Sequence, residues 1–453
     1  RKKETMSNLK AISPIDGRYS RQTVELSDYF SEYALIRYRV WVEIRYLLAL
    51  QTSPVGNFGL SEEQVKIIRS IGDEFSEDDS LRIKELESIT NHDVKSVEYF
   101  IKEQLDTEGL SFIREWVHFG LTSQDINNTS FPLMIADAWK NVLGPQLEDL
   151  IKIVRDTGMS LVHIPMLART HGQPASPTTL GKEILVFAER LDNQMKLLKH
   201  IPWQGKFGGA VGNMNAHYIA YPGFDWQEWA DKFLTSIGLE RQHTTTQIEH
   251  YDMLAAHFQG ITRINNILTD LCRDIWTYIS YEYFTQKLKK DEVGSSAMPH
   301  KVNPIDFENA EGNLGMANAF FGFLAGKLPV SRLQRDLTDS TVLRNVGVPY
   351  AHTLIAIKSI VKGWNKLVVN ENKIREELQQ NSIVLAEAIQ TVLRREHFDG
   401  AYEALKSLTR GRTSISREYL LSFVDSLDVN DEVKAELRKL EVEKYIGGWT
   451  PNK

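Results

Sequence analysis

The feature that most constrains the fold is a long apolar stripe with helical spacing in the middle of the chain. Apolar side chains recur at gaps of three or four residues, at Leu254, Phe258, Ile261, Ile264, Leu268, Leu271, Ile275 and Tyr278. This spacing places them on one face of a single α-helix. No proline occurs between Pro222 and Pro299, so we expect one helix from about Thr246 to Phe284. At about 1.5 Å per residue, such a helix would be roughly 55–60 Å long.

Two further stripes with the same spacing precede this helix. One runs from Leu180 to Leu198, and the other from Leu143 to Val154. Prolines near the second stripe, Pro132 and Pro145, are expected to introduce kinks, because proline removes a backbone donor from the helix.

Two more long helices are expected after the central stripe. The segment from Pro304 to Ala325 is rich in small residues, and a final helix follows "TDSTVLRN" and extends to Val361. Five long helices between residues 120 and 365 predict an elongated bundle, and their broad apolar stripes favour contact with other subunits. The expected fold class is all-α.

The ends of the chain differ from this bundle. Residues 6–119 show shorter helical patterns, and residues 366–453 suggest a small helical C-terminal domain. We therefore expect three domains, with the bundle at residues 120–365 between them. Strand signals are sparse, and "KFGGAVGNMN" (residues 206–215) could be a short hairpin or a loop.

Composition excludes several classes of protein. The chain has 53 Lys and Arg against 60 Asp and Glu, a net charge of −7, which argues against a dedicated nucleic-acid binder. Cys272 is the single cysteine, so no internal disulfide or multi-cysteine zinc site can form, and a reducing, cytoplasmic location is expected. No apolar run has the length of a membrane span or a signal peptide. Met6 could be the native start, with residues 1–5 either added before it or belonging to an upstream start, and residues 1–5 are left out of the fold expectations.

Polar clusters interrupt or cap the predicted helices. They are "TNHDVKSVEYF" (90–100), "HFGLTSQDINN" (118–128), "RTHGQPASPTT" (169–179), "TTTQIEHYD" (244–252), "GSSAMPHKVNP" (294–304) with its continuation to residue 313, and "SRLQRDLTDSTVLRN" (331–345). Each alone is compatible with a structural role. His92 could be a half-buried histidine, Ser123 an N-cap for a helix beginning near Asp125, and His171 a partner within its own turn. The histidines lack the short-spaced partners of a metal site, so no metal is expected.

Taken together, the clusters resemble a known family. "GSSAMPHKVNPIDFE" is similar to the signature loop of the fumarase/aspartase superfamily, whose members eliminate fumarate from a substituted succinate. Within that superfamily, "NHDV", "RTHGQPASPTTLGKE" and "RDLTDSTVLRN" resemble the adenylosuccinate lyases, in their longer bacterial form. The resemblance extends from Ser13 nearly to the C-terminus.

The resemblance implies a role for each residue that matches a family motif. Ser295 would be the general base that removes a proton beside a carboxylate, helped by loop amides and by Lys301. His171 would be the general acid that protonates the leaving nitrogen, and His92 would orient the substrate. Lys301 and Asn303 would donate hydrogen bonds to the carboxylate as its charge develops.

The remaining candidate residues would bind the substrate. Arginines and hydroxyls suit a phosphate, and a helix start suits any anion. The phosphate set is Arg18, Tyr19, Arg335, Ser340 and Arg344. The other predicted substrate contacts are Asn91, Asp93, Thr122, Ser123, Gln247, Ser296, Asn309 and Thr341.

The resemblance also implies the reaction and the assembly. The expected substrates are phosphorylated purine-pathway compounds: adenylosuccinate, giving AMP and fumarate, and the succinyl-aminoimidazole-carboxamide ribotide, giving the carboxamide ribotide and fumarate. No cofactor, nucleic acid or membrane is expected as a partner. A homotetramer with active sites shared between subunits is expected.

Two alternatives remain open at this point. Another fumarate-releasing lyase, such as argininosuccinate lyase, fumarase or aspartase, would share the signature loop, but its substrate carries no phosphate. A non-catalytic helical scaffold, like the lens crystallins of this superfamily, would not need Ser295, His171, Lys301 and Asn303.

Overall fold

The computed structural model describes residues 9–56, 58–287, 301–411 and 415–451. The chain divides into two compact units, which we describe separately. The first contains residues 1–147, 194–266 and 311–358, and the second contains residues 148–193, 267–310 and 359–453. In the described part of the chain, no helix is both long and apolar enough to cross a membrane.

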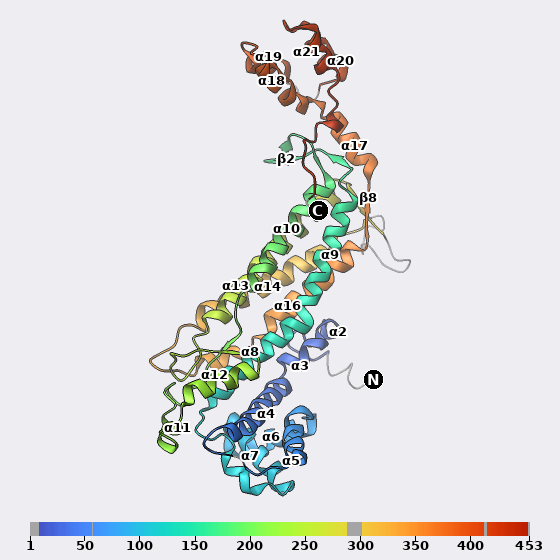
Figure 1. The fold of residues 1–453 in the computed structure, drawn as a ribbon. Helices are drawn as coiled ribbons and strands as arrows, with labels where there is room; N and C mark the ends of the chain where they lie inside the picture. Colours follow the sequence, from blue (N-terminus) through green and yellow to red (C-terminus); the bar gives the residue numbers. More distant parts are fainter. Residues whose placement is uncertain (1–8, 57, 288–300, 412–414, 452–453) are drawn as a thin grey trace. The chain divides into compact units, whose positions relative to one another are not determined.

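The first unit opens with a series of helices drawn in blue in Figure 1, several of which pack around an apolar core. They are α2 (Ser20–Thr23), η1 (Val24–Leu26), α3 (Ser27–Phe30), α4 (Glu32–Ala49), η2 (Leu50–Thr52), α5 (Glu62–Asp73), α6 (Glu77–Thr90), α7 (Asp93–Thr107) and η3 (Ser111–Trp116). Serines set two of the helix starts, because Ser61 and Ser76 each form a capping box with the residue three positions later. Val40, Ile68, Val97 and Ile101 are fully buried in the core of these helices.

The first unit continues with α8 (Ser123–Ala138), a π-helical turn (Trp139–Leu143) and the start of α9 (Gly144–Ser160). Pro132 lies inside α8, and Pro145 lies in the first turn of α9, directly after the π-helical turn. The kinks expected at Pro132 and Pro145 stay predictions. The other helices of this unit are α11 (Asn215–Ala220), α12 (Trp226–Ser236) and α15 (Thr338–Leu343). β5 (Gln204–Gly205) pairs in parallel with β6 (Glu240–Arg241).

The second unit contains several very short strands. β1 (Pro165–Met166) pairs with β4 (Thr178–Thr179), β2 (Arg169–Thr170) with β3 (Gln173–Pro174), and β7 (Phe284–Gln286) with β8 (Leu367–Val369), all antiparallel. Its C-terminal helices are α17 (Glu371–Gln380), η5 (Ser382–Leu385), α18 (Ala386–Arg395), α19 (Ala401–Thr409), α20 (Arg417–Ser426), α21 (Asp431–Arg438) and η6 (Val442–Lys444). Leu378, Ile389, Leu393 and Val424 are fully buried in the core of these helices.

Besides α9, four long helices contribute residues to both units. They are α10 (Leu180–Leu198), α13 (Asp252–Ser280), α14 (Ile305–Lys327) and α16 (Gly347–Trp364). These helices and the α8–α9 segment confirm the five predicted long helices and the all-α fold. The apolar stripe from Leu254 to Ile275 is buried, as its spacing predicts.

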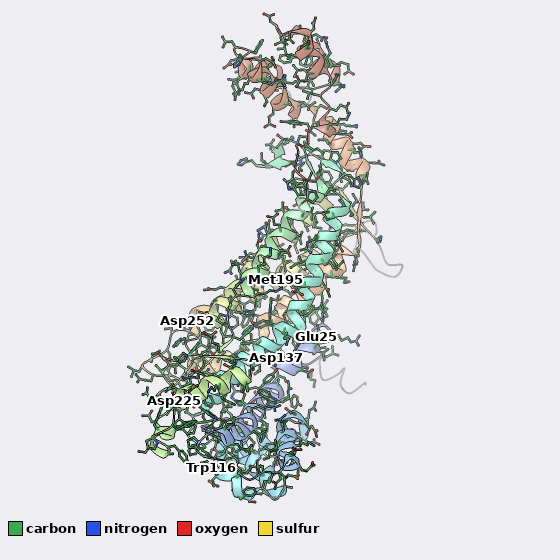
Figure 2. All side chains as sticks on the ribbon, in the orientation of Figure 1. Glu25, Trp116, Asp137, Met195, Asp225 and Asp252 are labelled. Carbon is green, nitrogen blue, oxygen red and sulfur yellow. The ribbon has the colours of Figure 1, made fainter. Side chains whose placement is uncertain are left out.

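The predicted ends of the central helix were wrong. The helix starts at Asp252 (labelled in Figure 2) and ends at Ser280, so it is about 44 Å long at 1.5 Å per residue. Tyr251, directly before it, has a φ of 63° and cannot continue a right-handed helix backwards. The segment at residues 206–214 is a loop without strand, with Gly209 and Gly212 at positive φ.

Candidate active site

A pocket in the first unit brings together eight of the residues predicted to form a site. Its volume is about 440 Å³. The eight residues are Asn91, His92, Asp93, Ser123, Arg335, Ser340, Thr341 and Arg344. They come from three segments far apart in the sequence: the α6–α7 junction, the start of α8, and α15 with the residues flanking it.

The α6–α7 junction presents His92 to this pocket. Asn91 ends α6 in the left-handed conformation, with a φ of 54°, and His92 is the N-cap of α7. The Nδ1 atom of His92 accepts a hydrogen bond from the backbone N–H of Lys95 at 3.1 Å. A neutral imidazole in this arrangement carries its proton on Nε2. The side chain of His92 is 53% exposed, so the interpretation of His92 as a half-buried histidine is wrong.

Asp93 is held by two arginines. Its Oδ2 atom accepts hydrogen bonds from Arg39 at 2.8 Å and from Arg344 at 2.9 Å. Burial favours a higher pKa for Asp93, but the two guanidinium groups outweigh it and lower the pKa below its usual value. Arg344 also donates to Glu32 at 3.0 Å, so Asp93 and Glu32 together fix its position.

Arg335 is held by two neutral side chains, and its Nε atom lies 3.7 Å from the carboxylate of Asp339. It donates to Ser340 Oγ at 2.8 Å and to Gln247 Oε1 at 3.2 Å. The amide of Gln124 also donates to Ser340 Oγ, at 3.4 Å. Gln247 is thereby joined through Arg335 to the lining of the pocket.

The start of α8 differs from the prediction in one detail. Ser123 is the first helical residue, and the N-cap is Thr122, whose backbone N–H donates to Asp125 Oδ2 at 2.8 Å. The prediction of Ser123 as N-cap was therefore wrong by one residue. Thr122 and Ser123 are both partly exposed and lie at the positive end of the helix dipole, where an anion is stabilised.

Arg18 and Tyr19 lie beside a second pocket of the first unit. That pocket has a volume of about 610 Å³, and Asp16, Ser20 and Arg344 are among its lining residues. The exposed guanidinium of Arg18 lies 6.0 Å from the centre of the Tyr19 ring. Arg344 lines both pockets, so it connects the segment that carries Arg18 and Tyr19 to the first pocket.

The other predicted residues belong to the second unit or lie outside the described residues. His171 is exposed at the turn between β2 and β3, with a φ of 53°. Lys301 is exposed and Asn303 partly buried, and Asn309 lies near the start of α14. Ser295 and Ser296 lie outside the described residues.

The hairpin that carries His171 is anchored by its neighbour Arg169. This side chain forms an ion pair with Glu377 and lies over the ring of Tyr281, 5.2 Å from its centre. These contacts hold the backbone on one side of His171 while leaving its imidazole exposed.

Sequence reasoning missed several residues of the first pocket. Glu87, Gln124, Asn127 and Leu337 line it, and Arg39 holds Asp93 and Asn127 from behind. Gln124 and Asn127 stood inside the cluster at residues 118–128 and could have been included. Arg39 gave no signal, because it lies in α4 among apolar residues that look like core.

The arrangement suits a substrate with more than one anionic group. Two arginines, several hydroxyl groups and a helix start converge on one pocket, and charge-assisted hydrogen bonds of this kind are the stronger class. His92 offers a proton donor or acceptor at the same place.

Comparisons with known proteins agree with this chemistry. Residues 17–319 match a family model described as lyase, and residues 331–446 match one described as adenylosuccinate lyase C-terminal. Adenylosuccinate lyase from Dictyostelium discoideum is 54% identical over 455 residues, which cover 98% of this chain and 97% of that protein. Adenylosuccinate lyase from Escherichia coli (strain K12) is 47% identical over 445 residues, which cover 98% and 97%.

Solved structures show the same fold at low identity. The crystal structure of 3-carboxy-cis,cis-muconate lactonizing enzyme from Pseudomonas putida matches with a TM-score of 0.73 at 18% identity, covering 94% of each chain. The crystal structure of fumarate lyase from Mesorhizobium sp. BNC1 matches with a TM-score of 0.71 at 18% identity, covering 94% of this chain and 95% of that one.

Proposed function

Because the chain belongs to the adenylosuccinate lyase family, and is therefore a lyase, we propose that it splits adenylosuccinate into AMP and fumarate. The same β-elimination would release fumarate from the succinyl-aminoimidazole-carboxamide ribotide and leave the carboxamide ribotide. Both substrates carry a phosphate and a succinyl group with two carboxylates.

One observation carries this proposal: Arg335, Arg344 and Ser340 converge on the pocket that His92 and Ser123 also line. A phosphate needs several donors with positive charge, and a guanidinium with hydroxyl neighbours supplies them. A superfamily member acting on malate or aspartate would have no use for these arginines. Arg18 and Tyr19, beside the second pocket, would complete the phosphate site through Arg344.

The succinyl group would lie toward the start of α8. Thr122, Ser123 and Gln247 would bind one carboxylate, helped by the positive end of the helix dipole. His92, with Asn91, Asp93 and Thr341 beside it, would orient the substrate. Lys301, Asn303, Asn309 and Ser296 would bind the carboxylate that accepts charge during elimination.

The elimination needs a base, an acid and donors around a carboxylate. Ser295 would remove the proton from the carbon beside that carboxylate. The electron pair of the broken C–H bond would then form the new C=C bond as the C–N bond breaks. His171 would protonate the leaving nitrogen. Lys301 would stabilise both the Ser295 alkoxide and the charge that develops on the carboxylate. No cofactor is required for these reaction steps.

We extend the proposal to the assembly. The chain would form a homotetramer in the cytoplasm, with each active site built from more than one subunit, and would be organised as domains at residues 6–119, 120–365 and 366–453. Shared sites would explain why the candidate residues come from so many distant segments of one chain.

The test is a fumarate-release assay with three substrates: adenylosuccinate, argininosuccinate and malate. We expect release from adenylosuccinate alone. Release from argininosuccinate or malate, without release from adenylosuccinate, would replace the proposed function by that of another superfamily member. No release from any of the three would support the non-catalytic scaffold.

A further inference from the structure

A buried ion pair lies behind the start of α8 and makes no part of the pocket lining. Lys206 Nζ and Asp125 Oδ1 are 2.8 Å apart, and neither side chain has any exposed surface. Lys206 follows β5, and Asp125 is in the first turn of α8. A fully buried ammonium group is rare, and it destabilises the folded state unless it is paired. We therefore asked what the Lys206–Asp125 pair holds in place.

Asp125 joins two segments of the chain, the start of α8 and the loop that begins at Lys206. Its Oδ2 atom accepts the backbone N–H of Thr122 at 2.8 Å, and its Oδ1 atom accepts that of Gly208 at 2.8 Å. The N–H of Gly209 lies 3.1 Å from both oxygens. Lys206 adds a hydrogen bond to the carbonyl of Gly209. The pair therefore joins the cap of α8 to the loop that follows Lys206.

This loop in turn reaches the substrate-binding candidates. The side-chain amide of Gln247 donates to the carbonyl of Ala210 at 3.1 Å, and its oxygen accepts from Arg335. Gly212 has a φ of +85°, and a Cβ added there would lie 2.3 Å from the carbonyl oxygen of Thr245. The loop is thus packed tightly against the segment that carries Gln247.

The charges at this junction also matter. Without Lys206, the Asp125 carboxylate would place an uncompensated negative charge in the first turn of α8. That charge would offset the positive potential that the helix dipole places at Thr122 and Ser123, and would repel an anion bound there, because a buried charge is poorly screened by solvent.

We propose that Lys206 is a positioning residue for the candidate site: it neutralises Asp125, and the pair holds the start of α8 and the glycine loop so that Thr122, Ser123 and Gln247 can bind an anionic substrate. This inference rests on the proposed function, because it concerns the same site. Lys206 itself does not touch the substrate.

The experiment compares the Lys206→Met variant with the double variant Lys206→Met/Asp125→Asn. The single variant leaves the carboxylate unpaired, whereas the double variant removes both charges and keeps a side-chain oxygen for the loop amides. KM and kcat for fumarate release are measured with whichever of the three substrates the wild type cleaves. Arg45→Met is the control, since Arg45 pairs with Asp73 and neither residue lines the pocket.

We expect Lys206→Met to raise KM at least tenfold while kcat stays within about threefold, and the double variant to return KM to within about threefold of wild type. Arg45→Met should leave both constants unchanged. A KM for Lys206→Met within twofold of wild type overturns the inference. A double variant as impaired as the single variant also overturns it, because lost packing would then explain the effect.

Folding is checked by the melting temperature of each variant. If Lys206→Met does not fold, the double variant alone tests the inference. A KM of the double variant near that of wild type supports neutralisation of Asp125 as the role of Lys206, and a tenfold increase in this KM overturns it. An inactive wild type with all three substrates refutes the proposed function and this inference together, whereas an active wild type with unaltered KM in the variants refutes this inference alone.

Discussion

The two arginines of the pocket have different surroundings, and this difference assigns them different roles. Arg344 donates to the carboxylates of Glu32 and Asp93, so much of its charge is compensated within the chain. The Nη atoms of Arg335 bond to Gln247 and Ser340, which are neutral, while the carboxylate of Asp339 lies 3.7 Å from its Nε atom. Arg335 therefore has more charge to offer a phosphate.

The first prediction tests this assignment. Arg335→Ala should raise KM for adenylosuccinate about 10–100-fold, because a charge-assisted contact contributes roughly 1.5–3 kcal/mol. It should also narrow the gap in kcat/KM between the nucleotide and its dephosphorylated nucleoside. The control is Arg332→Ala, since the side chain of Arg332 is 79% exposed and pairs with Asp336. Equal reactivity of nucleotide and nucleoside in the wild type would refute the phosphate assignment.

At the scale of elements, helix starts and one tight loop set the geometry of the site. The start of α7 places His92, and the start of α8 places Thr122 and Ser123. The loop at residues 206–214 packs between α8 and the segment before α13, where Gly212 leaves no room for a side chain. These helix starts and this loop orient the polar groups that the tertiary structure brings together.

The second prediction concerns this loop. Gly212→Ala combines an unfavourable positive φ with a clash against Thr245, so it should lower the melting temperature by several degrees and raise KM through displacement of Gln247. Gly223→Ala is the matched control, because a Cβ there would meet no atom within 4 Å. Thermal melts and fumarate-release kinetics on both variants make the comparison. Equal melting temperatures would show that the loop is not tightly packed.

At the scale of the whole molecule, buried histidines make stability depend on pH. Burial lowers the pKa of His217 to about 4 and that of His257 to about 3. An unfolded histidine has a pKa near 6.5, so the unfolded chain binds more protons below that pH, and stability falls as pH is lowered through 6.5. His118 has the opposite effect on stability. Burial favours a lower pKa for His118, but the adjacent Glu43 carboxylate outweighs burial and raises the pKa. The stability that His118 contributes is therefore lost as pH rises.

The third prediction follows from His257, which packs against the rings of Trp139 and Trp203. Between pH 7.5 and pH 5.0 the wild type should lose about 2 kcal/mol of unfolding free energy through this histidine alone. His257→Phe suits the aromatic surroundings and should reduce the drop in melting temperature over this range. His163→Gln is the control, because the side chain of His163 is 62% exposed. A pH dependence of His257→Phe identical to that of wild type would contradict the assignment.

The fourth prediction tests the proposed assembly. His171→Asn and Ser295→Ala should each abolish most turnover, whereas mixing the two proteins under conditions of subunit exchange should restore part of it. If sites are shared between subunits, some mixed sites contain both intact residues. Subunit exchange is verified separately with differently tagged chains, and mixing each variant with itself is the control. Verified exchange without any recovery would refute sites built in this way.

The sequence by itself determined the helices and the chemical character of the clusters. Helical spacing is a short-range property, so the stripe from Leu254 to Ile275 predicted its buried face correctly, and the motif at residues 331–345 indicated the arginines and hydroxyls of the pocket. The signature loop pointed to the family before any contact was known. Helix ends were less predictable, because the start at Asp252 depends on how Tyr251 packs.

Tertiary structure alone decided which polar groups meet. Arg39 and Asp93 lie 54 positions apart, and Lys206 and Asp125 lie 81 apart, so no local pattern relates them. Lys206 in "GKFGG" reads as a solvated loop lysine, yet it is fully buried. The physical reason is that the free energy of a buried charge depends on its distant partners and on the solvent they exclude, and only the folded chain specifies both.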